Sequence, residues 1–257
     1  MRNIEQVDVI TIANKIDEAL FTTLNNVSQQ SYKDINHIVI YRQASNSETK
    51  KLQNFKHRKN LLYYCQQGTG IASAFNNGIV RGRGKLILFL NSGDTLVEDN
   101  VIERVVDSYS QKNWLWAMGE TISVSRNRYL KKHRPQHQTW DKKLFLYGNP
   151  VCHQSTFYSR NLIERVGKYD ESLSLEMDYE YNIRANLLSD PTLLYFPVSY
   201  YDTTGVSSIR VFKQFNHHRR IRDRYFSLSQ LERIKIDTYC LLKSILRLAM
   251  VPAKLWL

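Results

Sequence analysis

The segment from Gly84 to Asp94 constrains the fold more than any other part of the chain. It reads GKLILFLNSGD, an apolar run of strand length that ends in a small polar turn with one carboxylate. Such a strand is typical of a parallel sheet covered by helices, and in these sheets ligands bind beyond the carboxyl ends of the strands. Asp94 could therefore hold a divalent metal, and the metal a diphosphate. The alternative is that Asp94 only caps the turn or the next helix.

The rest of the chain alternates strand-like and helix-like segments, which predicts an α/β fold with a doubly wound sheet. The predicted strands cover residues 7–13, 35–41, 61–65, 85–90, 114–124, 155–158 and 193–202. The predicted helices cover residues 16–30, 47–57, 71–80, 97–110, 140–147, 160–166 and 176–188. A basic, irregular loop is expected between residues 125 and 139.

Length and cysteine content favour a cytoplasmic enzyme. A chain of 257 residues is long enough for one α/β domain with a sizeable core. Cys65, Cys152 and Cys240 lack the spacing of a metal site, and an odd, scattered set argues for a reducing compartment and against disulfides. The first eight residues are polar and charged, so no secretory signal is expected.

The net charge of +12 is concentrated at the C-terminal end of the sequence. Residues 205–257 carry eleven Lys and Arg against three acids, a net +8 that leaves +4 for residues 1–204. From Leu228 onward apolar residues recur at helical spacing, and Lys243 and Arg247 interrupt them, which argues against a membrane-spanning helix. We therefore predict an α/β domain over residues 1–204 and a basic amphipathic helical extension over residues 205–257.

An anionic membrane surface is the expected partner of this extension. The alternative is a helix that packs on the α/β domain or in a homodimer. Nucleic-acid binding would use similar charges, but the sequence contains no recognisable nucleic-acid module, so no nucleic-acid partner is expected.

Four sets of motifs, in unbroken order over roughly residues 5–200, resemble the family 2 glycosyltransferases. They are VITIAN (9–14) with VSQQSY (27–32), GI with AFNNGI (70–79), LNSGD (90–94), and CHQSTFY (152–158) with GKYDE (167–171) and MDYE (177–180). Members of this family use a nucleotide-sugar donor and have a GT-A fold. Motifs in this order are far more specific than any one of them alone.

The resemblance implies roles for two carboxylates. Asp94 would hold Mn²⁺ or Mg²⁺ against the donor diphosphate. Asp178 would be the catalytic base, facing the sugar opposite the leaving group so that attack inverts the anomeric carbon. A helix start at this point would favour the charged carboxylate. The alternative for Asp178 is a solvated acid in the first turn of a helix, with Glu176 and Glu180 as nearby substitutes for the base.

The resemblance also implies two sets of binding residues. Those on the acceptor side are His153, Gln154 and Glu176. Those for the nucleotide-sugar are Thr11, Ala13, Asn14, Tyr41, Arg42, Gly70, Asn76, Asn91, Ser92 and Gly93. His153 could ligate the metal, contact a phosphate or hydrogen-bond a loop, and the alternative is a core histidine with satisfied hydrogen bonds.

The sequence departs from the family around the nucleotide. The acid that usually ends the second strand is replaced within YRQASN (41–46), a second acidic position falls at Gly68, and a Tyr-Asp pair is replaced by Ala72-Ser73. A pocket without its base-reading acids loses discrimination, which puts a uridine donor in doubt. Tyr41 and Arg42 could instead stack on a base or grip a phosphate.

Together these observations predict an inverting, metal-dependent glycosyltransferase. Its acceptor would be a lipid-linked or nascent cell-surface glycan (O antigen, capsule or exopolysaccharide), at the cytoplasmic face of a bacterial inner membrane. The alternative is a degenerate GT-A fold that serves as a non-catalytic binding or assembly subunit.

Overall fold

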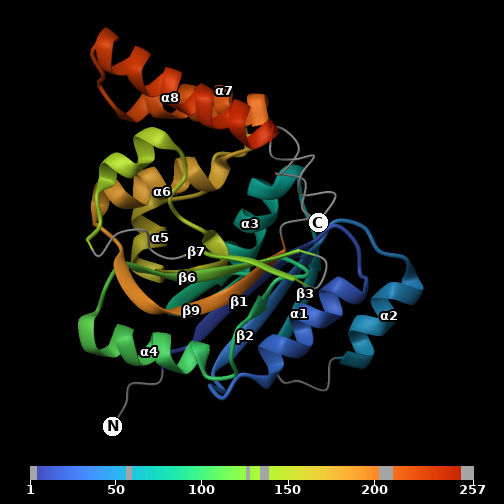
Figure 1. The fold of residues 1–257 in the computed structure, drawn as a ribbon. Coiled ribbons are helices and arrows are strands. Elements are labelled where there is room, and N and C mark those ends of the chain that lie inside the picture. The colour runs from blue at the N-terminus through green and yellow to red at the C-terminus, as the bar shows by residue number, and fades with distance from the viewer. Residues whose placement is uncertain (1–4, 56–59, 126–127, 134–138, 203–210, 250–257) are drawn as a thin grey trace.

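The computed structural model describes residues 5–55, 60–125, 128–133, 139–202 and 211–249. These residues form a nine-stranded sheet with helices on both faces (Figure 1). The strand order is β3-β2-β1-β4-β8-β6-β9-β5, and β7 pairs with β6 outside this path.

The first half of the sheet is parallel. It consists of β1 (Val7–Ala13), β2 (Ile35–Tyr41), β3 (Leu61–Cys65) and β4 (Leu86–Phe89). Parallel neighbours need crossover connections, which here are α1 (Glu18–Gln29), α2 (Asn46–Asn54) and α3 (Gly70–Arg81). The carboxyl ends of all four strands therefore meet at one edge of the sheet.

The second half of the sheet is mixed. Strand β8 (Thr156–Ser159) runs antiparallel to both β4 and β6 (Trp116–Ser125), whereas β9 (Thr192–Asp202) runs parallel to β6. The short strand β5 (Thr95–Leu96) pairs with β9, and β7 (Arg128–His133) forms an antiparallel pair with β6. The doubly wound prediction is thus right for the first half of the sheet only.

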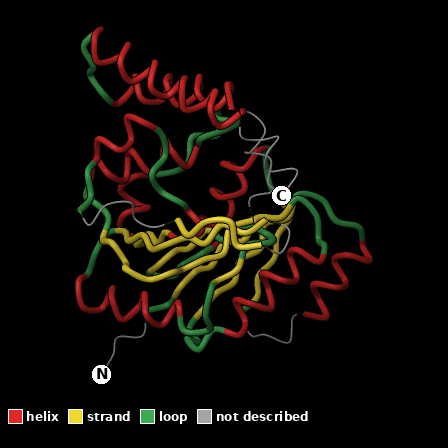
Figure 2. Tube along the Cα trace, in the orientation of Figure 1, coloured by secondary structure: helices red, strands yellow, loops and turns green. Residues whose placement is uncertain are grey.

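Helices cover both faces of the sheet (Figures 1 and 2). One face is covered by α1, α2 and α4 (Val101–Lys112), and the other by α3, α5 (Arg160–Val166) and α6 (Met177–Leu188). The α3 side is rich in stacked aromatic rings: Tyr169 and Tyr181 lie 4.0 Å apart between ring centroids, and Phe75 and Phe89 4.5 Å apart. Such pairs stabilise a core beyond the area they bury.

A buried ion pair ties the amino-terminal part of β1 to the start of α5. The carboxylate of Asp8 has no exposed surface and accepts hydrogen bonds from Arg160 Nη2 at 2.7 Å, Gly84 N at 2.6 Å and Asn36 Nδ2 at 3.0 Å. A Cβ at Gly84 would lie 2.7 Å from Asp8 Cγ, so a side chain at that position would displace the carboxylate. Hydrogen bonds of this kind are what make a buried charge tolerable.

The C-terminal helices pack against the α6 side of the molecule (Figure 1). Helix α7 (Val211–Tyr225) contacts α6, and α8 (Gln230–Ala249) contacts α7 and the short 3-10 helix η2 (Lys142–Tyr147). The predicted boundary between residues 204 and 205 lies outside the described residues. In the described part of the chain, we find no helix that is both long and apolar enough to span a membrane.

Helix α8 has two different faces. Ile236 is buried, and Arg233, Asp237, Cys240 and Ser244 are half-buried on the same side, toward α7 and η2. The opposite side is apolar and exposed; its large residues are Leu231, Ile234, Leu241, Leu242, Ile245 and Leu246. Helix α8 therefore carries an exposed apolar stripe on the side away from α7 and η2.

The predicted elements agree with the structure to within a few residues, with one correction. The segment expected to be an irregular loop, residues 125–139, contains β7, which pairs with β6 through contacts such as Thr121 with His133. The basic sequence of this segment does not predict a strand, because an edge strand is held by pairing with its partner strand rather than by a local alternation of apolar residues. The helix predicted near residues 140–147 is the 3-10 helix η2.

Candidate active site

Asn91 and His153 meet at the carboxyl edge of the parallel strands. Asn91 follows β4, and His153 opens the 3-10 turn η3 (His153–Ser155) just before β8. Since β4 and β8 pair with Leu88 opposite Phe157, the end of one strand lies beside the start of the other. Asn91 Nδ2 lies 3.0 Å from His153 Nε2, so the two predicted site residues are in direct contact.

The contact continues from His153 to Asp178 on the first turn of α6. His153 Nδ1 lies 3.6 Å from Asp178 Oδ2, and Asn149 Nδ2 donates to the same oxygen at 3.0 Å. The ring of His153 thus lies between Asn91, at its Nε2 side, and the carboxylate of Asp178, at its Nδ1 side. The side chain of Asp178 keeps 25% of its surface exposed, so it is held by two partners and still open to a substrate.

Two opposing effects set the pKa of Asp178. Burial, the largest single effect, raises it, but the adjacent charged ring of His153, the Tyr179 backbone N–H and the charge of His218 together lower it more. The net pKa lies below the usual value for an aspartate. Asp178 is therefore ionised at neutral pH and ready to accept a proton.

The other two acids of this segment are engaged elsewhere. Glu180 is buried and pairs with Arg184 at 2.8 Å. Glu176, in the left-handed conformation at φ 62°, accepts a hydrogen bond from Gln214 Nε2 at 2.6 Å and contacts His218 Nε2 on α7. Of these three acids, Asp178 is the one in contact with His153.

Asp94 lies in the turn after β4, on the α1 side of the sheet edge. It is 4% exposed, and its backbone carbonyl accepts a hydrogen bond from Thr23 Oγ1 at 2.8 Å. Gly93, at φ +96°, donates from its N–H to the same hydroxyl at 2.9 Å, a conformation that favours glycine. Ser92 N donates to Ile12 O at 3.1 Å, which ties the turn to β1.

The predicted nucleotide residues at the ends of β1 and β2 are neighbours. Ala13 pairs with Tyr41 in the β1–β2 register, and Arg42 N donates to Ala13 O at 2.9 Å. Asn14 and Arg42 are exposed and Tyr41 is half-buried, so all three can face a ligand at this edge. Burial raises the pKa of Tyr41, and the nearby Cys65 and Tyr63 raise it further, which keeps its hydroxyl protonated.

Four other predicted residues have internal contacts. Thr11 is buried, with Oγ1 2.8 Å from His37 Nε2. Gln154 is buried and accepts from Cys152 Sγ at 3.0 Å. Asn76 joins α3 to the segment after α5, since it accepts from Tyr169 N at 2.9 Å and donates to Tyr169 O at 3.0 Å. Gly70 begins α3 with φ +87°. Their assignment to ligand binding remains a prediction.

Asn149, Gln214 and His218 are site residues that sequence reasoning missed. Asn149 lies in the Gly148-Asn149-Pro150 break before the His153 motif, and this polar break was the available signal. Gln214 and His218 come from α7, more than 35 residues after Glu176, and no spacing rule links them to it. The tertiary packing of α7 on α6 is what brings them together.

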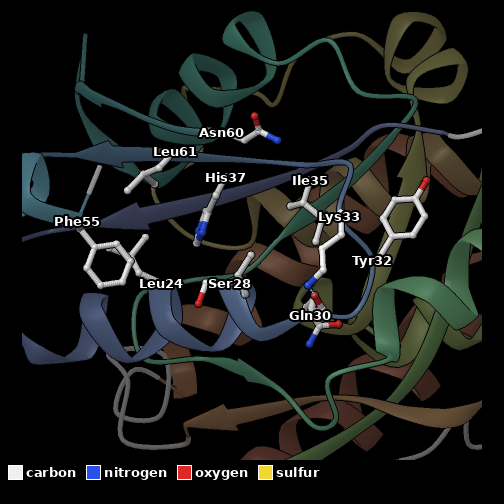
Figure 3. Close-up of a pocket in the computed structure, with 11 residues that line it drawn as sticks. Leu24, Ser28, Gln30, Tyr32, Lys33, Ile35, His37, Phe55, Asn60 and Leu61 are labelled. Carbon is white, nitrogen blue, oxygen red and sulfur yellow. Dashed lines mark hydrogen bonds between the residues drawn. The ribbon is translucent and has the colours of Figure 1, made fainter. Parts of the chain in front are cut away.

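A cavity of about 300 Å³ lies at the amino-terminal end of the parallel strands, opposite their carboxyl edge (Figure 3). His37, Ile35 and Leu61 line it at the start of β2 and β3, together with Leu24 from α1. It is therefore separate from the carboxyl edge where the predicted site residues gather.

Comparisons with known proteins agree with this arrangement. Residues 9–166 match the family described as Glycosyl transferase family 2. A curated relative, an uncharacterized glycosyltransferase of Mycobacterium tuberculosis, is 29% identical over 216 residues, which is 82% of this chain and 80% of the relative. A PGL/p-HBAD biosynthesis glycosyltransferase of Mycobacterium bovis is 26% identical over 203 residues, 75% of each chain.

Solved structures show the same fold. The structure of Staphylococcus aureus TarS 1-349 in complex with UDP has a TM-score of 0.69 at 13% identity and covers 92% of this chain and 70% of that one. The mannosyltransferase PcManGT from Pyrobaculum calidifontis, in complex with GDP-Man and Mn²⁺, has a TM-score of 0.63 at 14% identity and covers 97% and 75%. The chain belongs to glycosyltransferase family 2 and is a glycosyltransferase, as the sequence motifs predicted.

We expect the pKa of Asp178 to rise when His153 is replaced by phenylalanine. The His153→Phe variant keeps a ring beside Phe75, which packs against His153 with centroids 5.7 Å apart, but removes the nitrogen that lowers the pKa. Burial would then raise the pKa without the opposing effect of the imidazole. A carboxyl ¹³C NMR titration measures the shift, and exposed Asp190 serves as an internal reference. An unchanged Asp178 titration would contradict the coupling.

The same shift has a consequence for stability. A carboxyl whose pKa is lowered in the folded state stabilises the protein above the unfolded pKa, and this contribution disappears as the pH falls through the folded value. In the His153→Phe variant we therefore expect ionised Asp178 to contribute less to the free energy of unfolding at neutral pH. We also expect this free energy to begin to fall at a higher pH than in the parent protein as acid is added.

Proposed function

We propose that this enzyme transfers a sugar from a nucleoside diphosphate sugar to a hydroxyl of a glycan or lipid-linked glycan, with inversion at the anomeric carbon. The observation that carries the proposal is the ionised, partly exposed carboxylate of Asp178, in contact with His153 and Asn149 beside the turn after β4. Strand β4 and its turn lie where α/β sheets bind nucleotides.

The proposed chemistry assigns one role to Asp178. As the acceptor oxygen bonds to the anomeric carbon, the bond from that carbon to the diphosphate oxygen breaks and the nucleoside diphosphate leaves. The acceptor proton passes to Asp178, whose lowered pKa keeps it ionised beforehand. His153 and Asn149 both contact Oδ2 of this carboxylate, so they would orient it, and His153 would stabilise its charge.

We propose that the turn after β4 holds a divalent metal, Mg²⁺ or Mn²⁺. Asp94 offers a carboxylate, and Asn91 offers Oδ1, a buried oxygen with no hydrogen-bond partner among the described residues. Hard cations take such oxygens and keep their other positions for phosphate and water. When bound, the metal would neutralise charge on the leaving diphosphate. The described residues contain no group of three or more His, Cys, Asp or Glu side chains placed for a metal.

Relatives and structural neighbours support the substrate classes. The Mycobacterium bovis relative is named for PGL/p-HBAD biosynthesis, and the neighbours were solved with UDP, UDP-GlcNAc or GDP-Man. We propose a nucleotide-sugar donor and, as acceptor, a lipid-linked or nascent surface glycan such as an O antigen, capsule or exopolysaccharide. The missing base-reading acids leave the exposed Arg42 and half-buried Tyr41 as the groups available to the base or phosphates.

We further propose that the enzyme works at the cytoplasmic face of the inner membrane through α8. Its outer face is apolar, with Leu231 72% and Leu242 56% exposed, and the exposed cations Lys235 and Lys243 flank it. An apolar face with flanking cations fits an anionic lipid surface, where each Lys or Arg contributes about 1 kcal/mol. The packing of α7 on α6 holds this face outward.

Replacement of the base tests the reaction. We expect Asp178→Asn to lower the transfer rate by roughly 10²–10⁴-fold, the usual cost of losing a general base, and to leave nucleoside diphosphate binding nearly intact. Initial rates with a nucleotide-sugar panel and calorimetric nucleotide binding measure the two effects. Asp190→Asn, an exposed acid just after α6, is the control and should transfer normally. Unimpaired transfer by Asp178→Asn would refute the assignment.

Removal of the metal ligand tests the donor site without relying on turnover. We expect Asp94→Ala to weaken nucleoside diphosphate binding strongly in Mn²⁺ and little in EDTA, because the metal bridges the carboxylate and the phosphates. Calorimetry with UDP and GDP in both buffers makes the comparison. If the parent protein binds both nucleotides equally well with and without metal, the site is metal-independent.

Vesicle binding tests the proposed location. We expect the full chain to bind vesicles that contain phosphatidylglycerol and to bind them less tightly as salt shortens the screening length from about 10 Å at 0.1 M to about 3 Å at 1 M. The Leu242→Gln/Ile245→Gln variant should lose the salt-resistant part of the binding. Leu187→Gln, which changes an exposed leucine on α6, is the control. A full chain that ignores these vesicles would rule out the membrane proposal.

A further inference from the structure

A cavity of about 420 Å³ lies between the C-terminal helices and the segment that precedes the His153 motif. Its walls come from η2 and residues 148–150 on one side and from α7 and α8 on the other. None of the residues predicted to bind the nucleotide-sugar lines it. It is therefore a second space beside the active site, and the donor chemistry described above does not account for it.

The charges that line this cavity are all positive. Arg219, Arg222 and Lys243 contribute to the wall, with His218 beside them, and none of the lining residues is an Asp or Glu. Asp237 pairs from behind with Arg222 and lies 3.7 Å from Arg219, and Asp223 lies 3.7 Å from Arg222. These two acids position the guanidinium groups and partly neutralise them, while Lys243 adds a further exposed charge.

Arg222 is the most informative of these groups. It is 2% exposed, donates to Leu146 O at 3.4 Å, and its Nε has no hydrogen-bond partner among the described residues. A guanidinium is costly to bury unless its donors are satisfied. An arginine with unused donor capacity in a cation-lined cavity fits a phosphate, which guanidinium groups bind with matched geometry.

Aromatic side chains form the other part of the wall. Tyr147 and Tyr239 lie edge to face with centroids 5.3 Å apart, and Phe215 lines the same cavity. Tyr147 is 45% exposed and Tyr239 53% exposed, so both rings are open to solvent. Ligand pockets commonly combine such apolar surfaces with a few polar groups that fix orientation.

The cavity connects directly to the proposed base. Asn149 lines it and also donates to Asp178 Oδ2 at 3.0 Å. A molecule held in the cavity therefore lies one side chain away from the carboxylate that receives the acceptor proton. The exposed apolar face of α8, which includes Leu242 and Leu246, is carried by the same helix as Lys243.

We propose that this cavity binds the phosphate group of the acceptor and presents the neighbouring sugar hydroxyl to Asp178. The proposal rests on the function proposed above and adds a chemical class to it: a phosphate ester, either the head of a lipid-linked acceptor or part of a soluble phosphorylated glycan. Arg219, Arg222 and Lys243 bind the phosphate, and the tyrosine rings pack against the attached group.

Matched charge removals test the proposal. The variant Arg219→Gln/Lys243→Gln removes two lining cations, and the control Arg220→Gln/Arg224→Gln removes two exposed cations of α7 outside the lining. Arg222 is left in place because it is buried. The probes are a short-chain polyprenyl phosphate in neutral detergent micelles and glycerol 3-phosphate in solution, each titrated against the full chain in EDTA.

We expect the lining variant to bind the phosphate probe about tenfold or more weakly, a loss of about 1.4 kcal/mol or more, within the range for hydrogen bonds to charged groups. The control variant should bind normally. Selective binding of polyprenyl phosphate identifies a lipid-linked source, and binding of both probes identifies the phosphate alone. Equal losses in the two variants, or no binding by the parent chain, would overturn the proposal.

A separate readout distinguishes this proposal from the reaction itself. Nucleoside diphosphate binding in Mn²⁺ reports on the donor site, and slow hydrolysis of the nucleotide-sugar by water reports on the catalytic centre without an acceptor. If phosphate binding depends on the lining cations while Asp178→Asn transfers normally, the cavity proposal stands and the base assignment fails. If transfer depends on Asp178 but phosphate does not bind, the opposite holds.

Discussion

The buried pair of Asp8 and Arg160 is the interaction on which the geometry of the site depends. It joins β1, the connection before β4 and the start of α5, and Gly84 leaves room for the carboxylate. Removing one partner from such a pair typically costs about 3–5 kcal/mol, because the other charge stays buried. The pair holds the start of β4 beside the end of β8. The resulting register brings Asn91, which follows β4, to His153, which precedes β8.

From this contact the site extends by hydrogen bonds rather than by one continuous segment. Asn91 follows β4, His153 precedes β8, Asn149 precedes His153, and Asp178 begins α6. Each of these positions is the end of an element, where side chains are free to face a ligand while the backbone is held by the core. The pKa of Asp178 is lowered because these elements place His153 beside it, since burial alone would raise the pKa.

The C-terminal helices contact the segment that carries Asp178. Gln214 and His218 from α7 contact the carboxylate of Glu176. The backbone of Glu176 is in the left-handed conformation, just before the helix that carries Asp178. A non-glycine residue in that conformation persists only where surrounding contacts hold it. The extension therefore supports the active site on one side, while α8 presents its apolar stripe on the other.

The sequence by itself determined the family and the parallel strands to within a residue, because a buried strand followed by a polar turn is a local pattern. It missed β7, whose pairing with β6 depends on a partner strand rather than on its own hydrophobic pattern. It pointed to Asp178 as the base only through the family resemblance, with Glu176 and Glu180, acids of the same segment, as substitutes. Only the tertiary structure distinguishes the three acids, because it places His153 against Asp178, Arg184 against Glu180 and α7 against Glu176.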